Sequence, residues 1–331
     1  MNPDSIPFTR LMNLEDGNTS VLDSIKTWLI HDFEWLGNDR IVYARRSSTA
    51  CFTCGDYNIL YNYKQKTVDT LGIRNFDSQL NRIDQNSVAF FAADSNRFIV
   101  YETEGNHFKK IYEAKVDFNW DFYLDFSISP TKKKCYIFKF CIGSSNFEEN
   151  LIIDLTDDKF EYFSLDSSLK KIGLIEDLNS SSITDRPVWD SDSSFIFIKN
   201  WNLLIHYYFD GRYAVIDTLE RFEGYFGEDF VDKTLCDRYI CAVVYKIEKE
   251  TDRIESKLII YDMQDNYAKS VIDHGTEFWG LSHNHISDEL LYIKKEYNQY
   301  IMCSYSFRDK GIRQLLISNV FIRSPFAVPI E

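Results

Sequence analysis

The clearest β-hairpin in the sequence is Leu203-Leu-Ile-His-Tyr-Tyr-Phe-Asp-Gly-Arg-Tyr-Ala-Val-Ile-Asp-Thr-Leu219. Two runs in which apolar and polar residues alternate flank a short turn containing Asp and Gly, which is typical of two antiparallel strands. Similar stretches start at five other positions: Ile59, Phe98, Leu151, Leu258 and Ile301. The starts lie 39 to 55 residues apart, with a mean of about 48. The chain is therefore built on a repeated hairpin.

Two more strands precede each hairpin. An apolar strand is entered through a polar turn, for example Asn38-Asp39 before Ile41-Val-Tyr-Ala, and another strand lies before that turn, as in Phe122-Tyr-Leu-Asp-Phe-Ser-Ile. Four strands per repeat at this period predict an all-β fold, a β-propeller in which each repeat forms one four-stranded blade.

The two ends of the chain fit the same repeat. Phe8–Ile25 is similar to a seventh hairpin, and the tail Val320–Ile330 can supply the two strands that this hairpin lacks. A blade made from both termini would leave no open sheet edge there. We predict a single β-propeller domain over residues 1–331 with seven blades, and six blades is the alternative.

One repeat carries a recognisable motif. Pro187-Val-Trp-Asp-Ser-Asp-Ser-Ser-Phe-Ile-Phe-Ile198 resembles the Pro-x-Trp-Ser-Pro-Asp-Gly-x-x-Ile-x-Phe signature of WD40-like (TolB-type) propeller repeats. Weaker versions start at Phe33 and Phe126, and no copy keeps the Pro-Asp-Gly turn. Polar turn residues dominate the signature because it marks a tight turn between two strands. The resemblance implies a fold and no activity, since propellers have many unrelated functions.

The composition is globular with an acidic surplus. Of 331 residues, 44% are apolar, and 37 Lys and Arg stand against 51 Asp and Glu, so the net charge is −14. This surplus argues against a nucleic-acid or membrane-surface partner, because both need basic residues. We expect no membrane span and no secretory signal, since no apolar segment is long enough for either. Seven irregularly spaced cysteines predict reduced thiols and a cytoplasmic protein.

Two local patterns contain residue types that bind metals. Cys51-Phe-Thr-Cys54 has the spacing of half a zinc site, but no second such pair follows. His283-Asn-His285 places two imidazoles on one face of a strand, with His274 and Asp288 not far away in the sequence. Turn histidines more often bond to loop backbone, so we predict no metal and no cofactor. Metal binding by the His283–His285 pair stays an open alternative.

Aromatic and acidic residues concentrate in the connections expected on one face of the propeller. Aromatic side chains carry much of the binding energy at protein interfaces, and acidic groups around them attract a basic partner. The predicted binding residues are Trp28, Asp32, Asp117, Trp120, Asp121, Glu223, Tyr225, Phe226, Glu228, Glu277 and Trp279.

The leading functional prediction is a non-catalytic interaction module that binds a basic protein through this face, as an inhibitor or a toxin-neutralising immunity protein. Two alternatives remain. A propeller hydrolase or lyase would use paired carboxylates, which must converge within about 5–10 Å in one pocket. A carbohydrate-binding propeller would use Trp and Tyr as stacking platforms. No nucleophile elbow, zinc-protease or phosphate-loop motif occurs, so carboxylates are the catalytic groups to look for.

Overall fold

The computed structural model of the chain describes residues 8–12, 19–26, 30–36, 40–46, 56–62, 64–75, 81–82, 86–92, 97–115, 123–140, 150–156, 159–162, 187–219, 227–247, 254–284 and 287–319. These residues form strands, tight turns and one 3-10 turn, Met263–Asp265, so the prediction of an all-β chain is confirmed. None of the described helices is long and apolar enough to cross a membrane. The chain divides into two compact units.

The first unit comprises Met1–Phe126, Asp154–Lys159 and Val328–Glu331. It contains the hairpin of β1 (Phe8–Met12) and β2 (Thr19–Lys26), which confirms the predicted N-terminal hairpin. Eight further strands pair in one sheet: β3 (Ile30–Leu36), β4 (Arg40–Arg46), β5 (Asp56–Asn62), β6 (Thr67–Asn75), β7 (Asn81–Arg82), β8 (Ser87–Ala92), β9 (Arg97–Glu104) and β10 (His107–Lys115). Because β6 and β8 pair only at Asn75 and Ala92, this sheet consists of two successive four-stranded repeats.

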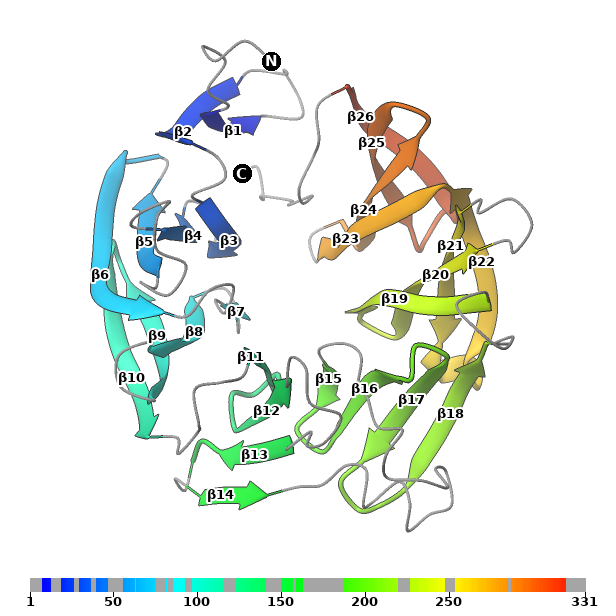
Figure 1. Cartoon of the computed structure of the whole chain (residues 1–331), viewed down its shortest axis with the longest axis horizontal. Coiled ribbons are helices and arrows are strands. Elements are labelled where there is room, and N and C mark those ends of the chain that lie inside the picture. The colour runs from blue at the N-terminus through cyan, green and yellow to red at the C-terminus, as the bar shows by residue number, and fades with distance from the viewer. Residues whose placement is uncertain are drawn as a thin grey trace. The chain divides into compact units, whose positions relative to one another are not determined.

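The second unit comprises Ser127–Ile153 and Phe160–Ala327. Three four-stranded antiparallel sheets lie entirely within it (Figure 1). Their strands are β15 (Val188–Ser191), β16 (Ser194–Lys199), β17 (Leu203–Tyr208), β18 (Tyr213–Thr218), β19 (Gly227–Cys236), β20 (Tyr239–Ile247), β21 (Ile254–Asp262), β22 (Ala268–Gly275), β23 (Glu277–Asn284), β24 (Glu289–Glu296), β25 (Gln299–Ser306) and β26 (Gly311–Ser318). A further sheet has strands in both ranges: β11 (Tyr123–Ile128), β12 (Lys134–Phe140), β13 (Asn150–Asp154) and β14 (Lys159–Tyr162).

Each of the six hairpins predicted from the repeat forms the third and fourth strands of a four-stranded group. The hairpin at Leu203, for example, is β17 and β18, joined by the turn around Gly211. Gly211 has a φ of +89°, which an L-residue rarely adopts, so the glycine of that turn is needed. The repeated four-stranded sheets are those predicted for propeller blades. The seven-blade count, the shared closing blade and the single domain remain predictions.

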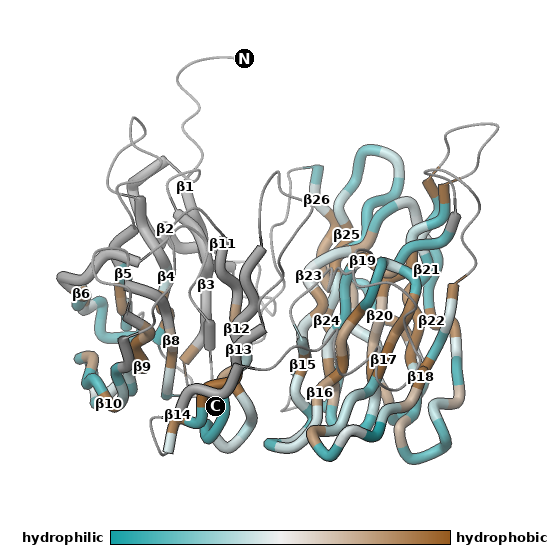
Figure 2. The backbone as a smooth tube through the Cα atoms, turned by 60° about the horizontal axis from the view of Figure 1, so that its bottom comes forward, coloured by the Kyte–Doolittle hydropathy of each residue, from teal (hydrophilic) through white to brown (hydrophobic). Residues whose placement is uncertain are grey.

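Hydrophobic packing between consecutive sheets forms the core of the second unit. The middle strand β16 is buried throughout and β20 over its central residues, whereas the outer strand β22 is largely exposed. One core cluster joins β15–β18 to β19–β22, and the next joins β19–β22 to β23–β26. Figure 2 shows the same division, with hydrophobic residues along the middle strands and mainly hydrophilic turns. Middle strands are apolar on both faces because a neighbouring sheet covers each face.

Candidate functional site

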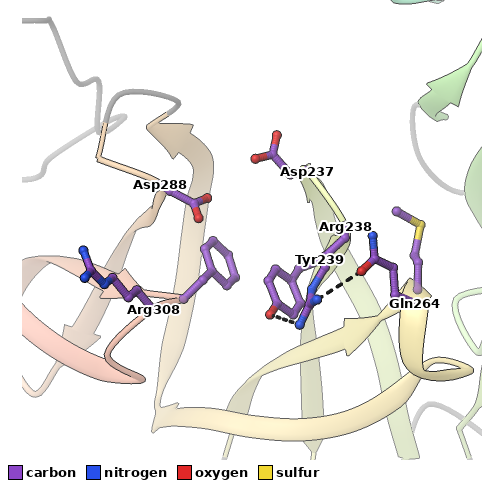
Figure 3. Close-up of a pocket in the computed structure, with 8 residues that line it drawn as sticks. Asp237, Arg238, Tyr239, Gln264, Asp288 and Arg308 are labelled. Carbon is purple, nitrogen blue, oxygen red and sulfur yellow. Dashed lines mark hydrogen bonds between the residues drawn. The ribbon is translucent and has the colours of Figure 1, made fainter.

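Four turns at one end of the sheets β19–β22 and β23–β26 surround a cavity of about 670 Å³ (Figure 3). They are the β19–β20 turn, the 3-10 turn after β21, the β23–β24 turn and the β25–β26 turn. The lining residues are Asp237, Arg238, Tyr239, Met263, Gln264, Asp288, Phe307 and Arg308. The cavity therefore brings charged, amide and aromatic side chains from two sheets together.

Two aspartates that line this cavity lie close to a buried histidine. Asp237 follows β19 and Asp288 precedes β24, and both have a positive φ, which Asp tolerates better than most residues. His283, near the end of β23, has a side chain only 3% exposed, and its Nε2 lies 3.1 Å from Oδ1 of Asp288. One ligand atom from each of Asp237, His283 and Asp288 lies within 4.8 Å of the others. Figure 3 shows the two aspartates on facing turns.

An aromatic pair and a fixed arginine form another part of the wall. The rings of Tyr239 and Phe307 stack almost in parallel, with centroids 4.6 Å apart and an interplanar angle of 3°. The Arg238 guanidinium lies 4.7 Å from the centroid of the Tyr239 ring and 2.8 Å from Oδ2 of Asp262. It also donates to Oε1 of Gln264 at 3.1 Å. These contacts hold Arg238 in one place and satisfy much of its charge.

The charges on the two aspartates are compensated much less. Asp237 has no hydrogen bond or ion pair with any residue that the structure describes, and Asp288 pairs with no described lysine or arginine. Arg308, on the Asp288 side of the cavity, likewise has no hydrogen bond or ion pair with a described residue. Uncompensated charges of both signs in a cavity are suited to binding a charged ligand.

Two cysteines next to the cavity lining, Cys236 and Cys241, are buried. Cys236 immediately precedes Asp237, and its Sγ lies 3.8 Å from Sγ of Cys241. Burial raises the pKa of the Cys236 thiol well above its usual value, and the hydrogen bond and charges of its neighbours add to the rise. A thiol nucleophile must ionise, so Cys236 does not supply one. The reactive groups of the cavity are the carboxylates and the imidazole.

The acidic pair and His283 permit two kinds of chemistry. Two neighbouring carboxylates can hold and accept a proton, which is the arrangement of acid–base catalysis. Two carboxylate oxygens and an imidazole nitrogen are also ligands that divalent metal ions accept. Both possibilities involve residues on different turns that meet only in the folded chain.

Three of the predicted binding residues are described together with their side chains, and they lie toward the opposite end of the same strands. Glu228, near the start of β19, pairs with Nζ of Lys257 at 2.9 Å, and Glu277, at the start of β23, pairs with Nζ of Lys295 at 3.3 Å. Trp279 packs edge-on against Tyr300, with centroids 5.7 Å apart. These contacts are internal to each sheet.

The other predicted binding residues cannot be placed in a site. Asp32 lies on β3, but its side chain is outside the described part of the chain. The remaining ones lie outside the described residues altogether: Trp28, Asp117, Trp120, Asp121, Glu223, Tyr225 and Phe226. His285 and the Cys51–Cys54 pair also lie outside. The acidic-aromatic face as a whole therefore stays a prediction.

The sequence indicated part of this site. His283 and Asp288 belong to the pattern of metal-binding residue types, whereas Asp237-Arg238 were interpreted only as a turn, and Phe307 and Arg308 were not predicted as site residues. The available signal was that the same first-to-second-strand turn recurs in every repeat, so that charged residues at this turn lie near each other in adjacent sheets.

No protein-family model matches the sequence, and no curated protein has significant sequence similarity to it. Among solved structures, the chain is similar to an oligogalacturonate lyase in complex with manganese, with a TM-score of 0.58, 9% identity and coverage of 93% of this chain and 83% of the lyase. Prolyl oligopeptidase B from Galerina marginata gives a TM-score of 0.61 at 9% identity, over 91% of this chain and 44% of that one. The Swd1 propeller domain from Myceliophteria thermophila gives 0.55 at 9% identity, over 91% and 88%. The predicted resemblance to WD40-like (TolB-type) propellers is confirmed at the level of the fold.

These findings correct the leading functional prediction. The non-catalytic interaction module is wrong, because the similar structures include oligogalacturonate lyases and fit the alternative of a propeller hydrolase or lyase better. The error came from counting acidic and aromatic residues without knowing their partners, and Glu228 and Glu277 are already paired with lysines. The predicted basic partner is not tested by any contact in the structure.

Proposed function

We propose that the chain is a propeller hydrolase or lyase that acts on an acidic saccharide in the cavity between the Asp237 and Asp288 turns. The observation that carries the proposal is the convergence of Asp237, His283 and Asp288, whose ligand atoms lie within 4.8 Å of one another. This is the close pair of carboxylates that the enzyme alternative requires. Carboxyl groups of retaining glycosidases stand about 5–5.5 Å apart, and those of inverting enzymes about 6.5–9.5 Å. Carboxylate oxygens within 4.8 Å of each other are close enough for both groups to act on the same bond.

The three residues have different access to a substrate. The Asp288 side chain is 55% exposed, whereas that of His283 is 3% exposed and lies 3.1 Å from Oδ1 of Asp288 through its Nε2. We therefore assign Asp288 as the group that accepts a proton and His283 as the residue that positions it. In a lyase reaction, Asp288 takes the proton next to the substrate carboxyl, the electron pair forms the new double bond, and the glycosidic oxygen leaves with a proton from the Asp237 carboxyl.

Arg308 gives the reason to expect an acidic saccharide. It lines the cavity and has no hydrogen bond or ion pair with a described residue, so its guanidinium is available to a carboxylate or phosphate of the substrate. The Tyr239–Phe307 stack supplies a rigid apolar wall for the ring edges of a sugar. Oligogalacturonate, the substrate in the name of one structural neighbour, is a saccharide of this acidic class.

The proposal is tested by incubating the full chain with oligogalacturonate and with a neutral oligosaccharide of equal length. Release of reducing ends shows cleavage, and ultraviolet absorbance of the unsaturated product separates a lyase from a hydrolase. We expect turnover of the acidic substrate, loss of turnover in the Asp237→Asn/Asp288→Asn variant, and no change in Asp265→Asn, an exposed residue of the neighbouring 3-10 turn. Turnover that survives in the double variant would contradict the proposal.

We also propose that the sheets belong to one seven-bladed propeller whose last blade joins β1 and β2 to the C-terminal segment 320–330. The observed β1–β2 hairpin supports this, since it lacks two strands of a blade. Deleting residues 320–331 should then lower the midpoint of thermal unfolding by several degrees. An unchanged midpoint contradicts the shared blade.

We further propose that the protein is cytoplasmic. Four buried cysteines are free thiols, as is typical of a reducing compartment: Cys135, Cys236, Cys241 and Cys303.

A further inference from the structure

We propose that Asp237, His283 and Asp288 form a binding site for one divalent transition-metal ion, of the Mn²⁺ and Zn²⁺ type. The site is assigned from these residues alone and goes beyond the proposed function, because paired carboxylates can act without a metal. Its test measures ion binding directly and does not depend on turnover.

The distances fit a single ion. Bonds from such an ion to nitrogen or oxygen are about 2.0–2.2 Å long, so two ligand atoms of the same ion lie at most about 4.4 Å apart. The three ligand atoms here lie within 4.8 Å of one another, and Nε2 of His283 and Oδ1 of Asp288 are already 3.1 Å apart. The two exposed aspartate side chains can move to bring their oxygens within bonding distance of one ion.

The ligands are held by rigid neighbours. Cys236, directly before Asp237, is completely buried, and so is Leu290, which pairs with His283 across β23 and β24. Both belong to one core cluster together with Phe307, whose ring lies edge-on to the His283 imidazole at 6.3 Å. The backbone at Asp237 and His283 is therefore held by the core, which lowers the entropy cost of binding an ion.

The local charge also favours a cation. Asp237 and Asp288 bring two negative charges together, and neither pairs with a lysine or arginine among the described residues. Arg238, which lines the same cavity, is instead bonded to Asp262 and Gln264. Like charges at this separation repel, and a divalent ion between them removes the repulsion.

The ligand types indicate which ion. One imidazole nitrogen with two carboxylate oxygens suits Mn²⁺ or Zn²⁺, whereas Ca²⁺ prefers six to eight oxygens and Mg²⁺ mostly oxygens and water. Three protein ligands on an open cavity leave further positions for water or a substrate oxygen, as in catalytic metal sites. If each aspartate binds through one oxygen, its second oxygen stays available for proton transfer.

The experiment is a titration of Mn²⁺ into the full chain after treatment with EDTA and dialysis, followed by calorimetry and by the midpoint of thermal unfolding. We expect one Mn²⁺ per chain and a higher midpoint with the ion, because the ion binds only the folded protein. Asp237→Asn and Asp288→Asn should each weaken binding by roughly tenfold or more, and the double variant should abolish it. Asparagine keeps the shape and tolerates the positive φ of both turns.

Asp265→Asn is the matched control and should bind Mn²⁺ like the unmodified chain. His283→Asn adds a third ligand test, and because this residue is buried its folding is checked by circular dichroism; the two exposed aspartates keep the test valid if it fails to fold. Absence of Mn²⁺ binding at millimolar concentration, or equal binding by the Asp237→Asn/Asp288→Asn variant, overturns the site. If Mn²⁺ binds as expected but no saccharide is cleaved, only the proposed function fails.

Discussion

The two ends of the sheets β19–β22 and β23–β26 carry similar residue types but differ in how their charges are satisfied. Near the starts of β19 and β23, Glu228 and Glu277 each pair with a lysine of the same sheet. At the other end, Asp237 and Asp288 converge without a described lysine or arginine. The four acidic residues are alike in the sequence, and only Asp237 and Asp288 keep a charge that no described lysine or arginine compensates. Net charge and composition cannot reveal this.

The sheet β15–β18 contains an aspartate–histidine pair that can be compared with Asp288 and His283. At the corresponding end of β15–β18, Nε2 of His206 lies 3.1 Å from Oδ2 of Asp190, the same separation as in the His283–Asp288 pair. Here, however, both side chains are mostly buried, and Nδ1 of His206 lies 2.7 Å from the Tyr267 hydroxyl. Both side chains of the pair thus have protein partners and little exposed surface. This pair is therefore structural.

The largest expected effect is on catalytic activity, which variants at the two ends of the sheets should change to very different extents. Asp237→Asn and Asp288→Asn should each lower kcat/KM on oligogalacturonate by about a hundredfold or more, since each removes a proton-transferring carboxylate. Glu228→Gln and Glu277→Gln, which remove paired charges at the other end, should stay within about threefold. Steady-state kinetics of all four variants measures the difference. Equal losses at both ends would contradict the comparison.

The next effect concerns stability. Phe307 is 7% exposed and packs against Tyr239, Tyr305 and His283, so Phe307→Ala should lower the free energy of unfolding by about 3 kcal/mol. Trp279 at the other end is only partly buried against Tyr300, and Trp279→Ala should cost about 1–2 kcal/mol. Denaturant unfolding measures both. A larger loss for Trp279→Ala would show that the other end is the better packed one.

The structural Asp190–His206 pair should appear in the pH dependence of stability. Burial alone raises the pKa of Asp190, but hydrogen bonds to His206 and Ser194 and the His206 charge outweigh it and hold that pKa below its usual value. A lowered pKa in the folded state means that the ionised carboxylate stabilises the fold above the ordinary Asp pKa. This contribution is lost as the pH falls through the folded-state pKa. Asp190→Asn should flatten the acid limb of stability, and thermal unfolding between pH 6 and about 2 tests this. An unchanged acid limb counts against the pair.

The smallest effect is expected for the paired acids. Glu228→Gln should change the free energy of unfolding by less than about 1 kcal/mol, because its partner Lys257 and the glutamate itself are both partly exposed. Raising the salt concentration should shrink the difference further. A loss of several kcal/mol would show that this end depends on its charges.

The repeat pattern was enough to predict the local architecture. Alternation around Leu203 and its five counterparts predicted six hairpins, all of which are present, because strand pairing across a short turn depends on neighbouring residues. The site was only partly predictable. His283 and Asp288 lie close in the sequence and were noticed together, whereas Asp237 lies about 50 residues away and resembled any polar turn residue.

The sequence by itself determined that the chain is all-β, that its strands come in groups of four, and that its net charge is negative. The strands follow from the pattern of neighbouring residues, and the net charge is a sum over all residues, so neither requires knowledge of distant contacts. Only the tertiary structure decided which acids are paired with lysines and which converge with a histidine in a cavity. That outcome depends on how the sheets β19–β22 and β23–β26 pack through their shared core, and therefore on contacts between residues far apart in the chain.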